Sequence, residues 1–563
     1  MRRHHAVLSL LLALVLCLGL LSVGALGSGE AEAVPETDEA LTEEAAVPAD
    51  DRIEENEPIG EAPDEETEAP DEEPADVSEA EPAEDGAPGG GGNKPGSGDQ
   101  PGSGGGSSSV SWKGASTITS GTTVTDGEYA SSTDQQNALL IDTKDDVTLE
   151  NPTATKTGAG GNSDNYSFYG INAAIMVKGG TTTTINGGTI YTTAAGANGV
   201  FSYGGNGGKN DAAGDGTTVI ISDTRITTTA DSSGGIMTTG GGVTYAYNLD
   251  ITTSGGSSAP IRTDRGGGTV VVDGGTYTST GLGSPAIYST ATISVKNATL
   301  ESKLSEGVCI EGKNSITLEN CDLTANNTSM NGKAQFLDTI MIYQSMSGDA
   351  NSGTSSFTMT GGSLTSKSGH VFHVTNTNAI ITLSGVEIRN EYDTDYPTLL
   401  SVCADGWSGG KNIATLNADA QTLTGGILVG SDATLTLNLK NGSTYTGYFY
   451  GVITNYKGTQ VSSSLGTVNV TLDATSKLYL QADADIASFS GDPANVVTNG
   501  HTLYVKGVAL EGTTESEDED PAETPELTDA NEDGNIDAAD AAWYLKENEP
   551  LKAAAFLRGI IKR

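Results

Sequence analysis

The sequence has few aromatic residues, few cysteines and no long run of charged, helix-forming residues between positions 109 and 510. Aromatic residues make up 5% of the 563 residues, and four residues are cysteines. This composition is typical of many short strands and tight turns. Cys17 lies in an apolar leader, and an odd number of remaining cysteines argues against a complete disulfide framework. Because those three also lack metal-ligand spacing, we expect them to be small buried or half-buried residues: Cys309, Cys321 and Cys403.

Basic residues are also scarce, since 28 Lys and Arg stand against 74 Asp and Glu and give a net charge of −46. Much of the acidic excess lies in the flanks, at residues 29–86, where Arg52 is the single base, and at residues 511–563. Phosphate repels such a chain, so the charge argues against nucleic acid as a partner.

Glycine is abundant, with 75 residues, and many glycines belong to an eight-residue repeat. The repeat reads apolar, any, apolar, any, Gly/Asn/Asp, small, any, apolar, and its best copy is residues 293–300. Successive copies are 23 to 26 residues apart, except in three intervals that carry insertions. The other copies are residues 147–154, 183–190, 219–226, 244–251, 270–277, 316–323, 357–364 and 381–388.

A period of this length indicates a solenoid or a propeller. The alternation within each copy places two apolar side chains on one face of a short strand, and a second strand signal precedes most copies. A propeller blade needs ~40 or more residues, so the period favours a coil with two or three strands. We therefore predict an all-β fold: one parallel β-helix solenoid over residues 109–512, right-handed because parallel crossovers prefer that hand.

The flanks predict export and flexible tethering. Residues 1–27 combine Arg2 and Arg3, an apolar run and small residues, which is typical of a secretory signal peptide. Residues 28–108 are acidic and then rich in Gly, Ser and Pro, so we expect a disordered linker. A second acidic linker is expected at residues 513–526. The mature chain is thus expected to be secreted, associated with the cell surface and without a membrane span.

An acidic loop near the C-terminus has the spacing of a calcium site. Oxygen-bearing side chains occupy loop positions 1, 3, 5, 9 and 12, with Gly534 at position 6 and Ile536 at position 8. Ca²⁺ needs six to eight oxygen ligands on a tightly curved loop, and position 6 must accept a positive φ. We expect folding of this loop to depend on Ca²⁺. The predicted ligands are Asp529, Asn531, Asp533, Asn535 through its carbonyl, Asp537 and Asp540.

Asp540 at position 12 and the apolar residues 541–546 that follow resemble a dockerin repeat, as found in bacterial carbohydrate-degrading assemblies. The resemblance covers residues 527–563 and includes one EF-hand-like loop, so this segment is similar to half a dockerin. Ala538 and Ala539 stand where dockerins tend to place the hydroxyl residues that read the partner. The resemblance implies a cohesin-bearing scaffold as a partner.

The repeat region resembles right-handed β-helix adhesin-like proteins exported by Gram-positive anaerobes. The resemblance implies an architecture and a surface location, but no particular ligand or reaction. It rests on residues 165–174, 235–242, 261–268 and 311–315.

Right-handed β-helices are often the fold of pectin-degrading enzymes, so an enzymatic function is a second possibility. Hydrolases on this fold need paired carboxylates, and lyases need an acidic Ca²⁺ cluster with a cationic base. The solenoid has no adjacent pair of aspartates besides Asp145 and Asp146. The sequence therefore favours a noncatalytic adhesin or carbohydrate-binding protein. A polysaccharide hydrolase or lyase, docked to a cohesin scaffold, is the alternative.

Aligning the second strand across coils predicts two outward-facing columns. The first column is Met176, Phe201, Met237, Arg262, Tyr288, Cys309 and Met341. The second column, beside the first, is Lys178, Tyr203, Thr239, Asp264, Thr290, Glu311 and Tyr343. Exposed aromatic residues tend to mark interaction sites, so we hypothesise that this face binds a polysaccharide or surface glycan. An alternative stays open, in which insertions at 201–218 and 324–356 fold over the face and bury it. The predicted ligand-binding residues are Tyr203, Arg262, Asp264, Tyr288, Glu311 and Tyr343.

Overall fold

The computed structural model describes residues 110–392, 394 and 396–513. The predicted signal peptide, both linkers apart from Thr513, and the calcium loop with its dockerin-like segment lie outside the described residues. Within the described part, nearly all regular structure is β-strand, and neighbouring strands in the long sheets are parallel. Its helices are α2 (Asp164–Tyr169) and the 3-10 turn η1 (Pro493–Asn495), and none is long and apolar enough to span a membrane.

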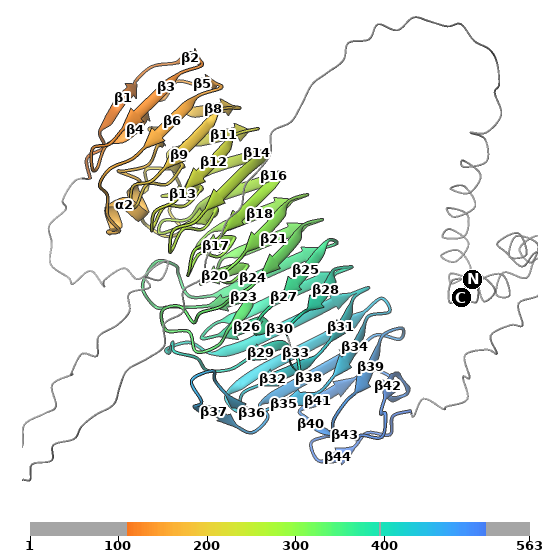
Figure 1. Ribbon diagram of the computed structural model, residues 1–563. Coiled ribbons are helices and arrows are strands. Elements are labelled where there is room, and N and C mark those ends of the chain that lie inside the picture. The colour runs from red at the N-terminus through yellow and green to blue at the C-terminus, as the bar shows by residue number, and fades with distance from the viewer. Residues whose placement is uncertain (1–109, 393, 395, 514–563) are drawn as a thin grey trace, which may run out of the picture. The chain divides into compact units, whose positions relative to one another are not determined.

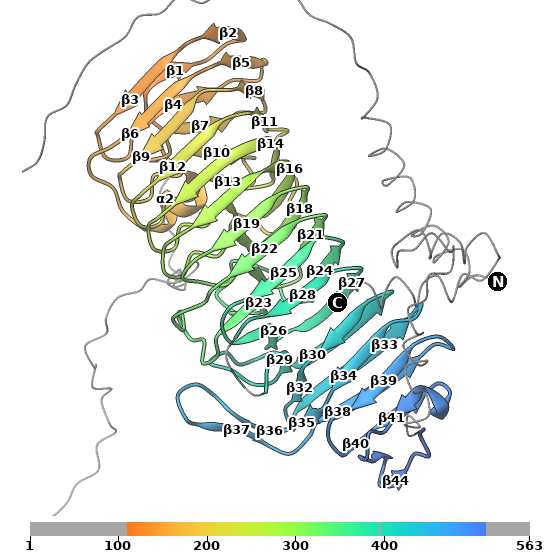
Figure 2. The same cartoon turned by 45° about the vertical axis from the view of Figure 1, so that its right-hand side comes forward.

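The strands stack as successive coils of a solenoid (Figures 1 and 2). Sheet A has 13 strands, one from each of 13 successive coils. Its order is β1 (Gly114–Ile118), β4 (Asn137–Asp142), β7 (Ile175–Lys178), β10 (Val200–Tyr203), β13 (Ile236–Thr239), β15 (Ile261–Thr263), β17 (Ile287–Ser289), β20 (Val308–Glu311), β23 (Asp338–Tyr343), β26 (His370–Thr375), β29 (Thr398–Val402), β32 (Gly426–Val429) and β35 (Phe449–Tyr450).

Sheet B has 22 strands in two columns, which the long strands β14 (Gly242–Thr253) and β16 (Gly268–Ser279) join. The first column is β2 (Thr122–Thr125), β5 (Val147–Glu150), β8 (Thr182–Asn186), β11 (Thr218–Ser222), β18 (Thr292–Lys296), β21 (Ser315–Glu319), β24 (Thr354–Thr360), β27 (Asn378–Ser384), β30 (Asn412–Asp419), β33 (Ala433–Lys440), β38 (Thr467–Leu472) and β41 (Ser488–Ser490). The second is β3 (Glu128–Ser131), β6 (Thr153–Lys156), β9 (Thr189–Thr192), β12 (Arg225–Thr228), β19 (Thr299–Ser302), β22 (Asp322–Ala325), β25 (Ser363–Ser366) and β28 (Glu387–Asn390).

The last coils add smaller sheets. The strands β36 (Val452–Thr454) and β37 (Gln460–Ser463) form an antiparallel hairpin that projects from the coils (Figure 2). A four-stranded sheet consists of β31 (Thr422–Thr424), β34 (Thr444–Gly447), β39 (Lys477–Leu480) and β42 (Val496–Val497). A three-stranded sheet consists of β40 (Ala484–Ile486), β43 (Leu503–Val505) and β44 (Val508–Ala509).

The register explains why the eight-residue repeat forms this fold. Ile293 of β18 pairs with Val270 in the preceding coil and with Ile316 in the next, so like residues stack. All three are buried in one continuous core. Stacked aliphatic side chains remove apolar surface from water in every coil, which is the main stabilisation of a solenoid. The prediction of a parallel all-β solenoid is confirmed, and its right hand stays a prediction.

The Gly/Asn/Asp position of the repeat forms the corner between the two columns of sheet B. Asn297 has a φ of 52°, a left-handed conformation that Gly, Asn and Asp adopt most readily. Its side-chain amide donates to Asp273 of the preceding coil at 2.7 Å. The small residue after the corner is buried, as in Cys321, whose thiol lies 3.4 Å from the Val295 carbonyl oxygen. Cys309 and Cys403 are buried too, which confirms the prediction for the three cysteines.

Segments that depart from the repeat lie over the outer face of sheet A, and we call them the cover. The α2 end of the cover is fixed by Thr239, whose hydroxyl donates to the Phe168 carbonyl at 2.7 Å, and by Trp112, whose indole N–H donates to the Tyr169 carbonyl at 2.6 Å. In Figure 1, α2 lies beside the first strands of sheet A. The cover consists of residues 157–172, 204–216, 326–337, 344–353 and 403–411.

Candidate functional site: the covered face and its cleft

The two columns predicted to be exposed are buried, apart from the half-buried Lys178, so the prediction of an exposed aromatic stripe is wrong. Tyr288 is 1% exposed, Arg262 is 2% exposed and Asp264 is fully buried. The structure instead confirms the alternative, in which insertions fold over this face. The physical reason is that the bulky outward side chains form small cores of their own with the cover. The other predicted ligand-binding residues are buried as well: Tyr203, Glu311 and Tyr343.

Two of the satellite cores beneath the cover contain the predicted aromatic residues. In the first, Tyr203 packs against Trp112 and Tyr169, with ring centroids 5.4 and 5.5 Å away. In the second, Tyr343 packs against Trp407, with centroids 4.9 Å apart. Tyr203 is thus separated from the other five predicted residues, which contact one another in and around the second core.

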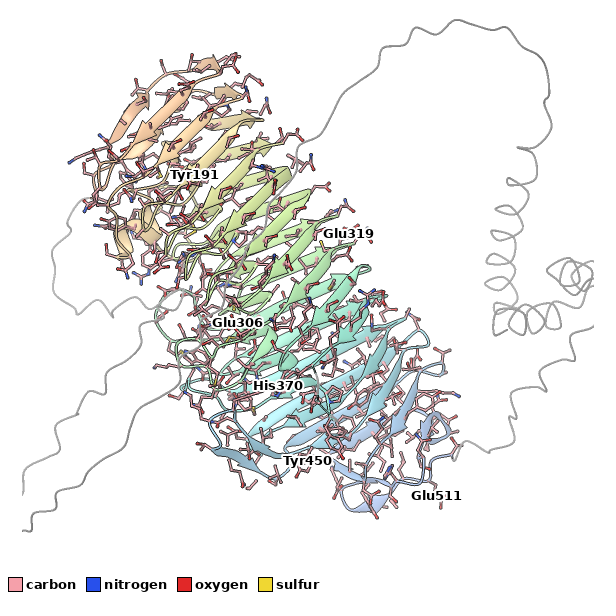
Figure 3. All side chains as sticks on the ribbon, in the orientation of Figure 1. Tyr191, Glu306, Glu319, His370, Tyr450 and Glu511 are labelled. Carbon is pink, nitrogen blue, oxygen red and sulfur yellow. The ribbon has the colours of Figure 1, made fainter. Side chains whose placement is uncertain are left out.

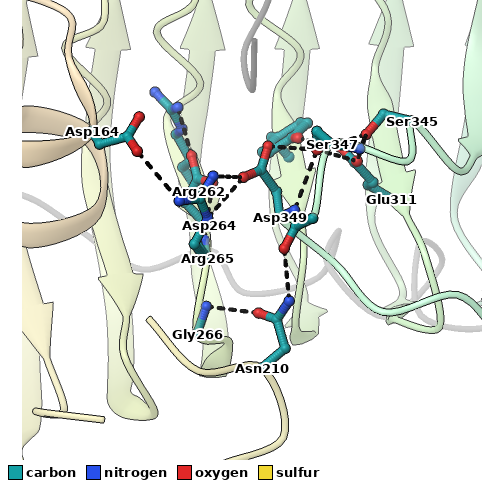
Figure 4. Close-up of polar contacts among 12 residues, drawn as sticks. Asp164, Asn210, Arg262, Asp264, Arg265, Gly266, Glu311, Ser345, Ser347 and Asp349 are labelled. Atoms are coloured by element: carbon teal, nitrogen blue, oxygen red, sulfur yellow. Dashed lines mark hydrogen bonds and ion pairs between the residues drawn. The ribbon is translucent and has the colours of Figure 1, made fainter. Parts of the chain in front are cut away.

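A buried ion network links sheet A to the cover (Figure 4). Arg262 donates to the Asp264 carboxylate at 2.8 Å. The guanidinium of Arg265 donates twice to Asp349 of the cover, at 3.0 and 2.6 Å, and also contacts Asp164 of α2 at 3.3 Å. Arg265 therefore contacts two segments of the cover, residues 157–172 and 344–353, which sequence spacing alone did not indicate.

Glu311 is the second centre of this network. Its carboxylate accepts hydrogen bonds from the hydroxyls of Tyr288 at 2.7 Å and Tyr343 at 2.9 Å, and from the Ser345 hydroxyl. Burial raises the pKa of both tyrosines well above the ordinary value, and the nearby Glu311 charge raises it further. The phenols therefore act here as neutral hydrogen-bond donors.

The network contains more carboxylates than cations. Asp264, Asp349 and Glu311 are fully buried, whereas Arg262 and Arg265 supply two positive charges. Burial raises the pKa of Asp264 to about 7; Arg262 opposes this rise and Asp349 adds to it. Below that pH, a proton on Asp264 leaves two buried carboxylates beside the two cations.

A second polar cluster lies further along sheet A, around His370 and His373. Both ring Nδ1 atoms lie 2.7 Å from the Ser401 hydroxyl, and His373 Nε2 lies 3.2 Å from Asp405. If Nε2–H of His373 donates to Asp405, the Ser401 hydroxyl donates to His373 and accepts from His370. Burial lowers the pKa of His370 to about 3, so its imidazole is neutral.

This cluster is sealed under the cover. The Phe336 ring lies 4.9 Å from the His373 ring, centroid to centroid, and the imidazole is fully buried. Neither carboxylate oxygen of Asp338 has a hydrogen-bond partner among the described residues, and burial raises the pKa of this group well above its usual range. Figure 3 labels His370 and Glu306 in this region. These buried polar groups join β26 and β29 to Asp405 of the cover.

An open polar cleft of about 390 Å³ lies beside the Arg265 network. Residues 210–214 and 350–351 of the cover and the turns at 266–269, 290–292 and 313–314 line it. Asn210 connects the walls, because it accepts from the Gly266 N–H at 2.9 Å and donates to the Gly348 carbonyl at 3.0 Å. The cleft therefore depends on contacts between segments that are far apart in the sequence.

Glycines allow the cover to approach the coil so closely at the cleft. A Cβ atom on Gly241 would lie 2.6 Å from the backbone nitrogen of Gly214, closer than real Cβ contacts. The floor is thus largely backbone, with N–H and C=O groups near the surface. On the rim, Asp211 forms an ion pair with Lys313 at 2.8 Å and accepts from the Asn351 amide at 2.5 Å.

The chemistry of the cleft is that of polar binding. Among its lining residues, all within the described part, Asp211 is the one carboxylate. The hydrogen bond from Lys313, followed by that from Asn351, lowers its pKa, so it is ionised. Glycoside hydrolysis requires two carboxyl groups, one of which acts as a general acid. This lining has no second carboxyl group beside Asp211. Within the described residues, no group of three His, Cys, Asp or Glu side chains is placed to hold a metal ion.

Sequence reasoning missed the cleft because its lining is mostly Gly, Asn, Thr and Ala in turns. The available signal was the length of the insertions, since the cover segments 204–216 and 344–353 fall in intervals longer than the basic period. Length alone does not tell which insertions meet. The fold and the cleft define a class: a parallel β-solenoid whose sheet A is covered by its own insertions. Comparison of the chain with protein-family models, with curated proteins and with solved structures gave no match.

Proposed function

We propose that this protein is a secreted, noncatalytic carbohydrate-binding protein that acts as an adhesin at the cell surface. The observation that carries the proposal is the open polar cleft, whose walls and floor present amide, ammonium, hydroxyl and backbone groups. Sugars offer many hydroxyl groups, each able to donate and accept. A preformed pocket with several convergent polar groups suits such a ligand.

The groups in the cleft that could bind a sugar are of two kinds: a charged pair on the rim and neutral polar groups on the floor. Lys313 and Asp211 hold each other at 2.8 Å, so a sugar hydroxyl can donate to the carboxylate and accept from the ammonium. Thr269 and Thr292 add hydroxyl groups from two neighbouring coils. Because the Asp211 carboxylate stands without a second acid in the lining, binding without bond cleavage is favoured over hydrolysis.

The test is a glycan array probed with the full-length protein and with Lys313→Ala. We expect the wild type to bind a defined set of glycans and the variant to lose most of that binding. Lys303→Ala is the matched control, since Lys303 is also an exposed lysine in an ion pair, 3.6 Å from Glu301. No glycan bound by the wild type, or equal binding by Lys313→Ala, would refute the proposal. Sugar fragments released from a bound polysaccharide would favour the docked hydrolase or lyase instead.

The proposal includes a calcium-binding, dockerin-like tail at residues 527–563, with a cohesin-bearing scaffold as its partner. The support is the loop spacing from Asp529 to Asp540, which supplies alternating oxygen ligands. Calorimetric titration of the full chain with Ca²⁺ is expected to show one tight site that Asp533→Ala removes. Only weak, diffuse binding, equal in both proteins, would contradict this part. Titration with a panel of cohesins then tests the partner.

A further inference from the structure

The outer face of sheet B begins at the floor of the cleft. Strand β14 starts at Gly242 and β16 at Gly268, and these two glycines pair in neighbouring coils. Thr269 lines the cleft and is the first half-exposed side chain of the outer row on β16. A ligand that leaves the cleft in this direction therefore runs along the outer surface of β14 and β16, which lie side by side in Figures 1 and 2.

An apolar and aromatic patch interrupts this outer surface. Tyr245 is 37% exposed and Tyr247 is 42% exposed, both on β14 and two residues apart, so they project from the same side. Ile220 and Val271 flank Tyr245 in the two adjacent coils. We call these four residues the tyrosine platform.

The platform departs from the rest of its row. Apart from its own members, the residues in register along the row are polar: Thr148, Thr184, Ser294, Thr317, Thr358, Thr382, Asn417, Asn438 and Thr471. The core does not need the platform, because Thr244 and Ala246 are the inward residues of this strand. An exposed aromatic cluster in an otherwise polar row is the kind of surface that marks an interaction.

The polar surroundings favour one kind of ligand. Ser222 and Asp273 flank Tyr247 in the adjacent coils, so hydrogen-bonding groups stand beside the ring. The platform thus presents flat apolar ring faces with polar groups beside them, and each tyrosine adds its own hydroxyl. A sugar ring has the same division, with C–H groups on its faces and hydroxyls at its edge.

We propose that the cleft and the tyrosine platform form one extended site for a linear oligosaccharide. One end of the chain occupies the cleft, and later sugar units stack on Tyr245 and Tyr247. Five residues of extended strand separate Gly242 from Tyr247, a span of ~17 Å, so the site takes several sugar units. This inference rests on the proposed function, because it extends the cleft that carries that function.

The experiment measures affinity against ligand length. The probes are fragments of increasing length, from one unit upward, of the glycan that binds most strongly on the array. For the wild type we expect affinity to rise with length until the platform is filled. For the double variant Tyr245→Ala/Tyr247→Ala we expect the shortest fragment to bind unchanged and the longest to lose about tenfold or more.

Tyr191→Ala is the matched control, because Tyr191 is a 40% exposed tyrosine in the other column of sheet B. It is expected to keep the wild-type length dependence. The extended site is overturned if the double variant gains affinity with length as the wild type does, while the proposed function survives because the cleft still binds. Absence of any binding, even by the wild type, overturns both. Loss of capture of another protein by the double variant, with glycan affinity unchanged, also overturns the extended site and assigns the platform to a protein partner.

Discussion

Replacing Arg265 by methionine should loosen the cover, because it removes the cation that the buried Asp349 contacts. The Asp349 side chain is fully buried and accepts two hydrogen bonds from the guanidinium, at 3.0 and 2.6 Å. The guanidinium also lies over the Phe168 ring, with 4.2 Å from Cζ to the ring centroid. Removing one partner of a buried ion pair leaves an uncompensated charge, which costs about 3–5 kcal/mol.

The assay combines urea unfolding with amide hydrogen exchange, since a solenoid can open locally. We expect faster exchange in residues 344–353 and a loss of several kcal/mol in local stability. The double variant Arg265→Met/Asp349→Asn should be less destabilised than Arg265→Met alone, because asparagine carries no charge. The control is Arg225→Met, whose ion pair with Asp250 at 2.7 Å is exposed and should contribute less than about 1 kcal/mol.

Two results would refute this reasoning. A loss below about 1 kcal/mol for Arg265→Met would mean that water reaches Asp349 and screens its charge. A loss in the double variant equal to the sum of the losses of Arg265→Met and Asp349→Asn, each measured alone, would mean that the two residues do not interact.

Three further predictions follow from groups described above. Burial raises the pKa of Asp264 to about 7 from an unfolded value near 3.9, so the folded state binds the extra proton and stability falls as pH rises from about 4 to 7; Asp264→Asn should flatten this part of a urea-midpoint profile. Asn297→Ala should cost about 1–2 kcal/mol and Asn297→Gly less, measured by thermal unfolding, because φ is 52° at this corner. Cys321 and Cys403 should react with a thiol reagent only on unfolding, since burial raises the pKa of both thiols; rapid reaction of the folded protein would contradict their burial.

The sequence predicts the coil far better than the surface. The stacking of Ile293 and the left-handed corner at Asn297 follow from spacing and residue type, because each depends on nearest-neighbour coils alone. The placement of Tyr288 beneath the cover does not, because the strand pattern shows only that its side chain leaves the core. What it meets there depends on insertions without a repeat of their own. The mixture of Met, Phe, Cys and Arg in the outward column was itself a sign of burial, since a solvated row is mostly Thr and Ser.

The same distinction explains the candidate site. The outward direction of Tyr245 and Tyr247 could be predicted from the sequence, because both occupy outward positions of the repeat copy at residues 244–251. The cleft could not be predicted from the sequence, because it depends on a contact between Asp211 and Asn351, which are 140 positions apart. No local pattern encodes a contact between two turns of that kind.

The contacts of the cover have a mechanical consequence. In a simple solenoid each coil holds only its neighbours, so a pull on the ends would peel the coils away one at a time. Here Asn210 forms a hydrogen bond with Gly348, and Asp211 forms one with Asn351. These two bonds connect the first and last of the coils that lie between these positions. Under tension this block should yield as one unit, at a higher force than the coils outside it. If the proposed adhesin function holds, the cover would protect the part of the solenoid that carries the cleft when the protein is pulled.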